Sequence, residues 1–472
     1  MRPFVRRTLL GFGGLLLLLV LFHLVENWRG SRAWKAWQKE QEAAGFNFDP
    51  ASYAPPLIPD DENFAAAPRV AAAIHGTGNL VKLTKELPYG PNMRGWQEGR
   101  AADLEVFRAV FKDGDLNKGL EENRVNLDDI EKAAARPGCR VAFDYAHFPE
   151  AEFPRLVGFR ATARLIQLRA LVALREGRQD AAFRDVTTLL RLANHFGKQP
   201  ILLCQLLGMA VAGITLQPIW EGMETHAWTE AQLASLQRML AKEDFLGSLN
   251  HALSFESSGM SARMVKLAER APWAWAPAPD VYSYSDGPVP HNRATTLIRQ
   301  LALPWGWILQ GAVRGQRAFK ETVSDPLDVA SHRIDPRRQD AALKAHSKRG
   351  RGPYSIFVAE AAPAIAAQNI RAARLQAILA NASVACDLER YHRTKGNYPE
   401  RLADLGVVIP ADVIGGQPLH YRRTAEGGYV LYSVGWNGAD DGGRVGQGEN
   451  AIQEGDWVWM IHGGTTVKAK KP

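Results

Sequence analysis

The side chains that could do chemistry are scattered along this chain and form no known catalytic motif. Its 12 histidines include no HExxH pair, and its glycines form no nucleophile elbow, phosphate-binding loop or dinucleotide fingerprint. Glu256, in a helical stretch, is the carboxylate that best fits a buried functional acid, and a solvated or capped helix glutamate is the alternative interpretation. The sequence therefore assigns no catalytic and no cofactor-binding residue.

A second place for chemistry is the aromatic, proline-rich stretch at residues 272–292. This stretch could be a loop that faces a ligand, or a cover packed over the helices. A cleft that it borders, gathering Glu256, His251 and His291, would indicate an envelope hydrolase or a ligand-binding protein. A packed helical body without convergent polar side chains would indicate a structural or interaction role.

The apolar run at residues 9–25 should determine on which side of a membrane the rest of the chain lies. It lies at the short end of the roughly 17–25 residues that a helix needs to cross the bilayer core. Arg2, Arg6 and Arg7 precede it, which predicts a cytoplasmic N-terminus and an extracytoplasmic body. We expect residues 1–27 to be a cytoplasmic stub and a single-pass anchor in a bacterial inner membrane, touching the lipid bilayer through residues 9–25.

Two alternatives to a membrane anchor stay open. The apolar run could be a cleaved signal peptide, although no small-x-small cleavage site follows Val25. It could also be a buried helix of a soluble protein.

The composition is that of a globular protein. Of the 472 residues, 46% are hydrophobic and 23% are charged, and the length predicts two or three domains. The net charge of +7 is spread along the chain and suits contact with an anionic bilayer or wall polymer. Since no basic stripe with interleaved aromatics occurs, we expect no nucleic-acid partner.

The three cysteines, Cys139, Cys204 and Cys386, are far apart in the sequence. Two interpretations stay open: one disulfide pair formed in an oxidising compartment, or buried unpaired thiols.

Apolar periodicity predicts a mainly α-helical body. Residues 28–152 should hold a juxtamembrane helix, a proline-rich segment and weakly helical stretches. Residues 153–350 should form an α-helical domain, which includes two amphipathic helices joined at residues 176–178 and a buried apolar helix at residues 201–220. A basic, turn-rich linker at residues 333–353 should end this domain near residue 350.

Residues 351–472 combine a long helix with strand-like runs. The helix runs from Ile370 to a GNYP turn at residues 396–399. From residue 388 onward the order of elements, with an acidic glycine-rich loop, resembles the globular end of type II secretion major pseudopilins. The same C-terminal pattern, after an alanine- and leucine-rich helical region, resembles a set of uncharacterised bacterial membrane-anchored proteins. The resemblance implies a small α+β domain. Strands are expected at Leu419–Arg423, Tyr429–Ser433 and Asp456–Trp459, with the first two paired as a hairpin.

In major pseudopilins the acidic loop binds calcium, and the resemblance implies a site formed here by Asn437, Asp440 and Asp441, with Asp456 closing it. Calcium needs several hard oxygen ligands held by a turn-prone backbone. Asn437 stands where the family usually has aspartate, which removes one charge and should weaken binding. A solvated turn shaped by its glycines is the alternative.

The chain departs from that family in its anchor. A pseudopilin joins its membrane helix directly to the globular end and carries a glutamate early in the apolar run. Here a long helical region separates the two, and residues 9–25 contain no glutamate. The resemblance therefore implies a shared fold and not a filament subunit. We expect a membrane-anchored structural or interaction protein of the cell envelope, linked to a secretion or surface assembly. The envelope hydrolase or ligand-binding protein is the alternative.

Overall fold

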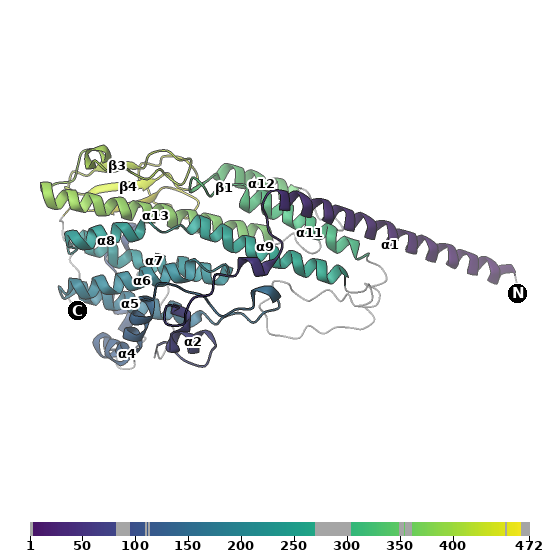
Figure 1. Ribbon diagram of the computed structural model, residues 1–472. Helices are drawn as coiled ribbons and strands as arrows, with labels where there is room; N and C mark the ends of the chain where they lie inside the picture. Colours follow the sequence, from purple (N-terminus) through teal and green to yellow (C-terminus); the bar gives the residue numbers. More distant parts are fainter. Residues whose placement is uncertain are drawn as a thin grey trace.

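The structure is a computed structural model that describes residues 3–81, 95–108, 111, 114–269, 304–348, 354, 361–448 and 451–463. The described chain is mainly helical, with a small antiparallel sheet near the C-terminus. Figure 1 shows a long helix, α1, projecting from a body of packed helices, with the sheet on one side of that body. The aromatic stretch at residues 272–292, with His291, lies outside the described residues.

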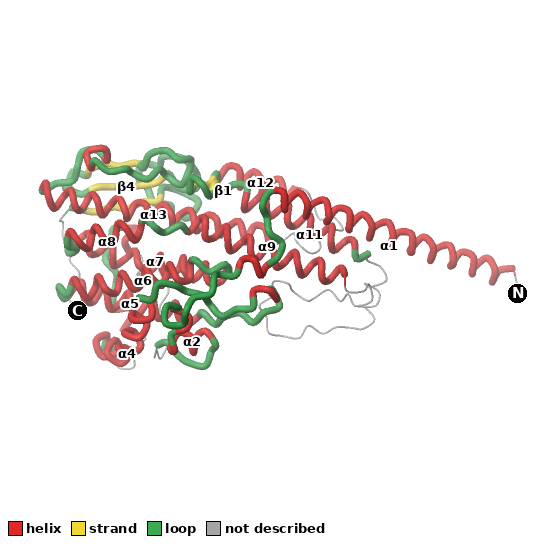
Figure 2. Tube along the Cα trace, in the orientation of Figure 1, coloured by secondary structure: helices red, strands yellow, loops and turns green. Residues whose placement is uncertain are grey.

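The body is built from helices that pack lengthwise. Figure 2 shows α5, α6, α7, α9 and α13 running side by side along it. Short 3-10 turns join some of the helices, and one of them, η4 (Gly95–Glu98), borders the groove described below. In the described chain the body helices are α2 (Pro68–Ile74), α3 (Glu105–Arg108), α4 (Leu116–Ala134), α5 (Val157–Arg175), α6 (Gln179–Gly197), α7 (Leu202–Glu224), α8 (Glu230–Leu240), α9 (Phe245–Glu269), α11 (Gly306–Phe319), α12 (Pro336–Lys348) and α13 (Ala361–Lys395).

One continuous helix, α1 (Pro3–Ala43), carries the apolar run and extends well beyond it. It ends before Gly45, whose φ of +88° suits glycine. The large apolar side chains of residues 9–25 are exposed. By length and composition α1 is a candidate membrane span, and so is α7, although most of α7 is buried inside the body. An exposed apolar surface of this length suits lipid, whereas α7 is the buried helix that the sequence predicts.

The part of α1 beyond the apolar run packs against α11. A Cβ on Gly30 would lie 2.2 Å from the carbonyl oxygen of Gly306, so the two backbones meet at glycines. Asn27 Oδ1 accepts a hydrogen bond from the Gly306 backbone nitrogen at 2.9 Å and so satisfies the start of α11. The two helices and α9 share a small apolar cluster made of Trp34, Trp37, Met264, Ala268, Ile308, Leu309, Ala312 and Val313.

A buried carboxylate, that of Glu26, fixes this junction at the end of the apolar run. Its Oε2 accepts hydrogen bonds from Trp307 Nε1 at 3.0 Å and from the Tyr354 hydroxyl at 3.0 Å. Arg29 pairs with its other oxygen at 2.5 Å. A buried carboxylate is tolerated only where such partners satisfy it. These contacts therefore hold the body against α1 at the end of its apolar run.

The predicted helical hairpin is confirmed. α5 and α6 are separated by a turn at Gly177, whose φ of +70° a residue without a Cβ adopts without strain. Thr229 begins α8 with a capping box, since its side chain and that of Gln232 exchange hydrogen bonds with each other's backbone nitrogens. The local pattern was therefore sufficient to place these helices.

The predicted linker at residues 333–353 is wrong over most of its length, because α12 occupies Pro336–Lys348. Asp335 Oδ1 accepts a hydrogen bond from the Arg338 backbone nitrogen at 3.1 Å, and Pro336 has a φ that suits a first helical turn. Gln339 of α12 is fully buried and donates to the Ala366 carbonyl of α13 at 3.0 Å. A basic composition resembles a linker, but here the charged residues cover the outer face of a docked helix.

The C-terminal strands form one antiparallel sheet in the order β3-β4-β5. Tyr429 of the central strand pairs with Arg423 on one side and with Ile461 on the other. The predicted hairpin is thus confirmed. The strands are β3 (His420–Arg423), β4 (Tyr429–Ser433) and β5 (Trp457–Ile461).

One continuous core joins the helical body to this sheet. Trp220 of α7 donates to the Met460 carbonyl of β5 at 2.7 Å, and Asn381 of α13 donates to the Trp457 carbonyl at 3.0 Å. Buried side chains from both sides of residue 350 therefore pack together. The domain boundary near that residue stays a prediction.

Candidate functional site

The structure places the four predicted calcium ligands around the loop that precedes β5. Asp456 Oδ1 accepts a hydrogen bond from the Asp441 backbone nitrogen at 3.3 Å, and its Oδ2 accepts one from Gly443 at 2.6 Å. Asp456 therefore shapes the loop backbone with both of its carboxylate oxygens. Asn437 and Asp440 are exposed at the loop surface.

Other side chains already contact the oxygens that would bind calcium. His420 Nδ1 lies 3.2 Å from Asp440 Oδ2. Asn437 Nδ2 donates to Asp441 Oδ2 at 2.8 Å, and Arg444 pairs with Asp441 Oδ1 at 3.1 Å. A calcium ion would have to replace these partners. Calcium binding here stays a prediction.

We expect millimolar calcium to raise the Tm of the full chain in detergent, because an ion that binds only the folded state stabilises it. Asp441→Asn should abolish the shift by removing one hard oxygen charge. Magnesium at the same concentration serves as the control and should shift the Tm less, because it demands a tighter octahedral shell. Identical melting with and without calcium would rule out the site.

Glu256 and His251 do not form an acid–base pair. Glu256 is half-buried on α9, and its Oε1 accepts a hydrogen bond from the Leu202 backbone nitrogen at 3.2 Å. Burial raises the pKa of Glu256 to about 7. His251, five residues earlier, is exposed and its ring lies against that of Tyr53 at 5.5 Å. The described structure brings no second catalytic group to Glu256, and His291 lies outside the described residues.

A groove between α5, α7 and α13 is a better candidate site. Its volume is about 400 Å³, near the lower end of the ~300–1,000 Å³ typical of small-molecule pockets. Trp96 of η4 closes one end. The groove is lined by Trp96, Gln97, Arg160, Leu206, Met209, Ala210, Gly213, Leu216, Gln368, Arg371, Arg374, Leu375, Ile378 and Ile452.

The floor of the groove is an apolar stripe on α7. Leu206, Ala210 and Gly213 recur at helical spacing and are only half-buried, unlike most of this helix. A Cβ on Gly213 would meet no atom within 4 Å, so open space lies directly above the helix there. Leu375 and Ile378 of α13 add apolar walls. An apolar ligand would therefore leave water on entering the groove.

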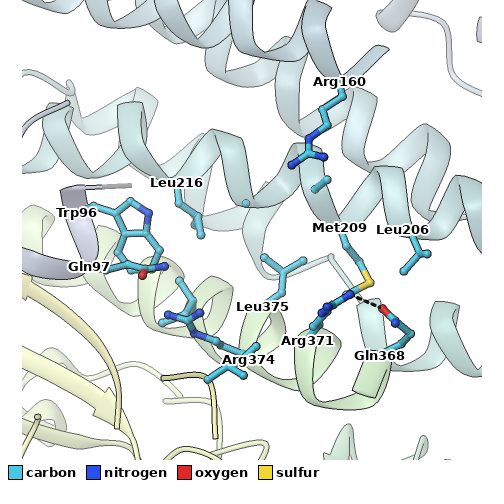
Figure 3. A pocket seen from close by; sticks show the side chains of 14 residues that line it. Trp96, Gln97, Arg160, Leu206, Met209, Leu216, Gln368, Arg371, Arg374 and Leu375 are labelled. Carbon is cyan, nitrogen blue, oxygen red and sulfur yellow. Dashed lines mark hydrogen bonds between the residues drawn. The ribbon is translucent and has the colours of Figure 1, made fainter. Parts of the chain in front are cut away.

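Three arginines stand around this apolar floor. Figure 3 shows Arg160 reaching in from α5, with Arg371 and Arg374 coming from α13. Arg371 Nη1 donates to Gln368 Oε1 at 3.3 Å. Among the described residues that line the groove there is no Asp or Glu. The groove therefore offers positive charge beside an apolar surface, and guanidinium groups bind carboxylates and phosphates in a two-pronged geometry.

Sequence reasoning missed this groove. The available signal was local and weak: Arg371 and Arg374 are three residues apart on a helix otherwise rich in alanine and other apolar residues. Such spacing places both on one helical face but does not show what that face meets. Arg160 reaches the groove only because α5 packs beside α7.

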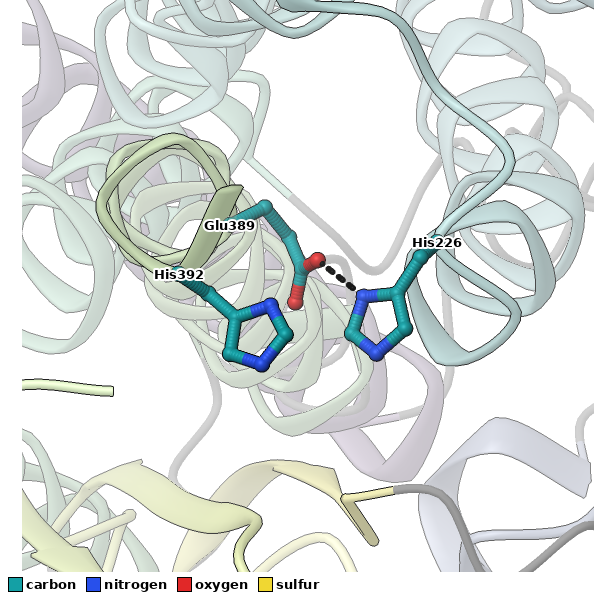
Figure 4. Close-up of side chains that lie close together, drawn as sticks. All are labelled: His226, Glu389 and His392. Atoms are coloured by element: carbon teal, nitrogen blue, oxygen red, sulfur yellow. Dashed lines mark hydrogen bonds and ion pairs between the residues drawn. The ribbon is translucent and has the colours of Figure 1, made fainter. Parts of the chain in front are cut away.

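A second group of polar side chains lies where the α7–α8 connection meets α13. His226, Glu389 and His392 each place one potential ligand atom within 4.8 Å of the others. Figure 4 shows the Glu389 carboxylate reaching toward both imidazoles. These residues are the described His and carboxylate side chains best placed to hold a metal. Their sequence separation hid them, since His226 and Glu389 are 163 positions apart.

Comparison with protein-family models, with curated proteins and with solved structures found no match to this chain. No relative therefore supplies a substrate, a partner or a site. The resemblance of the C-terminal elements to major pseudopilins stays an expectation. What the chain does must be argued from its own residues.

Proposed function

We propose that this chain is a membrane-anchored interaction protein of the cell envelope whose body binds a single-chain anionic amphiphile in the groove between α5, α7 and α13. One observation carries the proposal: an apolar floor on α7 and three arginines surround the same cavity, with no acidic side chain among its described lining residues. The apolar chain of the ligand would lie along Leu206, Ala210 and Gly213. Its carboxylate or phosphate would meet the guanidinium groups.

The size and charge of the groove select this class of ligand. A cavity of about 400 Å³ suits one acyl-type chain better than a whole two-chain lipid. A purely apolar ligand would make no use of the arginines, and a purely polar one would make no use of the apolar floor. An anionic head on an apolar tail satisfies both surfaces.

The anchor supports an envelope location for this binding. The exposed apolar side chains of residues 9–25 suit a bilayer, and Arg2, Arg6 and Arg7 favour a body on the extracytoplasmic side. Glu26 and its partners hold the body close to that bilayer. Amphiphiles that partition into the membrane would therefore be concentrated near the groove.

The sequence suggested an envelope hydrolase or a ligand-binding protein as the alternative function. Ligand binding is retained here, and the groove between α5, α7 and α13 is its site. A link to a secretion or surface assembly rests on the pseudopilin resemblance alone, through α13 and the β3-β4-β5 sheet. A hydrolase role has no comparable support, because the described residues around Glu256 offer no partner for acid–base catalysis.

Gly213→Leu is expected to abolish binding of a fluorescent fatty acid by the purified full chain, because the leucine side chain would fill the open space above α7. Folding should be kept, since nothing lies within 4 Å of the new Cβ and leucine favours a helix more than glycine does. Gly208→Leu is the contrasting variant: its Cβ would lie 2.6 Å from the Gly197 nitrogen, so its Tm should fall sharply. Unchanged affinity in the Gly213 variant would exclude the groove as the binding site.

Arg371→Gln is expected to weaken binding of the anionic chain by at least about tenfold, the loss of one charge-assisted hydrogen bond. Binding of the neutral alcohol of the same chain length should not change. Arg337→Gln, an exposed arginine of α12, is the matched control and should bind like the wild type. Titrations with a fatty acid and with a lysophospholipid separate a carboxylate from a phosphate head. Equal affinity of the wild type for charged and neutral chains would contradict the proposal.

A further inference from the structure

We propose that His226, Glu389 and His392 form a binding site for a transition-metal dication, with zinc as the ion that best fits. The proposal is independent of the groove, because the two sites share no residue. All three potential ligand atoms already lie within 4.8 Å of one another. His226 Nδ1 and Glu389 Oε2 are 2.8 Å apart.

Two of the ligands come from one face of one helix. Glu389 and His392 are three residues apart on α13, a spacing that puts their side chains next to each other. His226 approaches from the turn after α7, in a left-handed backbone conformation with φ of +50°. This conformation is uncommon for a residue with a Cβ, and here it brings the imidazole to α13. The tertiary fold thus assembles the set from a helix and a turn that are far apart in the sequence.

The carboxylate is oriented by an outer partner, as in many metal sites. The Tyr398 hydroxyl donates to Glu389 Oε1, which leaves Oε2 directed toward His226. The Glu389 side chain is only 2% exposed, whereas that of His226 is 33% exposed. The site is thus anchored in the protein interior through Glu389 and is open to solvent at His226. This opening lets an ion enter and leaves room for a water molecule as a further ligand.

The surrounding charge favours a cation. Glu224, whose side chain is 10% exposed, contributes a second buried carboxylate next to Glu389. His462 pairs with Glu224 at 3.3 Å. Arg393, on the last turn of α13, donates to the Trp228 carbonyl, and its positive charge acts on both imidazoles and partly offsets the two carboxylates.

The donor set selects the ion. Two imidazole nitrogens and one carboxylate oxygen match the ligands of zinc sites that keep one open position, and they are too few and too soft for calcium. The two imidazole rings are stacked, with centroids 4.7 Å apart and planes 9° apart. One ring must therefore turn about its Cβ–Cγ bond to direct its lone pair at the ion. His226, which lies on a turn and not within a helix, is the ring free to do so.

The test is zinc binding by the full chain in detergent, after treatment with a chelator. Calorimetric titration with zinc chloride should show one site that His226→Gln loses, with the affinity there reduced more than about 100-fold. Tyr398→Phe keeps all three ligands and should weaken binding by about tenfold, the size of an outer-partner effect. Cobalt(II) added in place of zinc should give a visible absorption band that the His226 variant lacks.

Controls separate this site from incidental binding by other histidines. His147 is also exposed and also pairs with a carboxylate, Asp144, at 2.7 Å. His147→Gln should keep both the stoichiometry and the cobalt band of the wild type. Melting curves without metal verify that each variant is folded. The proposal is overturned if folded wild type takes up no zinc, or if the His226 and His147 variants bind it equally.

Discussion

Replacing Arg169 with methionine is expected to lower the free energy of unfolding at about pH 8 by about 3 kcal/mol, because it leaves a buried carboxylate without its partner. Arg169 of α5 donates to Asp185 of α6 through Nε at 3.0 Å and through Nη2 at 2.6 Å. Its Nη1 donates to Asp128 of α4 at 3.1 Å. The Asp185 side chain is only 4% exposed, so water cannot replace the lost partner. One arginine therefore ties three helices together.

The loss should depend on pH in a defined direction. Burial raises the pKa of Asp185, and Arg169 opposes that rise. Without Arg169 the buried carboxylate will take up a proton more readily, so the variant should lose less stability at about pH 5 than at about pH 8. Urea unfolding of the full chain in detergent at both pH values measures the difference.

Arg124→Met is the matched control for this network. Arg124 is exposed on α4 and pairs with Glu121 at 2.8 Å and with Asp128 at 3.6 Å. Exposed pairs of this kind contribute at most about 1 kcal/mol. Equal losses in the Arg124 and Arg169 variants would show that burial gives the Asp185 pair no special weight.

Glu256→Gln is expected to stabilise the protein by about 2–3 kcal/mol at about pH 8, because it removes a charge that burial disfavours. The pKa of Glu256 is about 7 in the folded state, against an ordinary value of 4.5. The folded state thus binds this proton more tightly than the unfolded state. Its contribution to stability is present below about pH 4.5 and is lost as the pH rises through about 7. Glutamine keeps an acceptor for the Leu202 nitrogen without the charge.

Unfolding midpoints measured from about pH 5 to about pH 9 test this directly. The curves of the wild type and the Glu256 variant should meet at low pH and separate above neutrality. Glu122→Gln, an exposed glutamate on α4, serves as the control and should shift the curve little at any pH. Parallel curves for the Glu256 variant and the wild type would mean that its carboxylate is well solvated.

The helices and strands could be predicted because their signals are local. The apolar spacing of α5 and α6, the glycine turn at residue 177 and the capping box at Thr229 each depend on residues a few positions apart. The hairpin of β3 and β4 follows from two alternating runs around a glycine turn. The prediction of a linker at residues 333–353 was wrong because it also used local signals alone. The charged composition suggests a linker, and only the buried contact of Gln339 with α13 shows that the segment is a packed helix.

The sequence by itself determined an apolar N-terminal helix, a mainly helical body and a small C-terminal sheet, because periodicity and turn chemistry act over one or two turns. Only the tertiary structure decided that Arg160 faces Arg371 across an apolar groove, and that His226 meets Glu389. A local pattern shows which face of a helix is polar but not which helix will cover that face. Both candidate sites lie where one helix packs against another element, and so they can be recognised only in the packed structure.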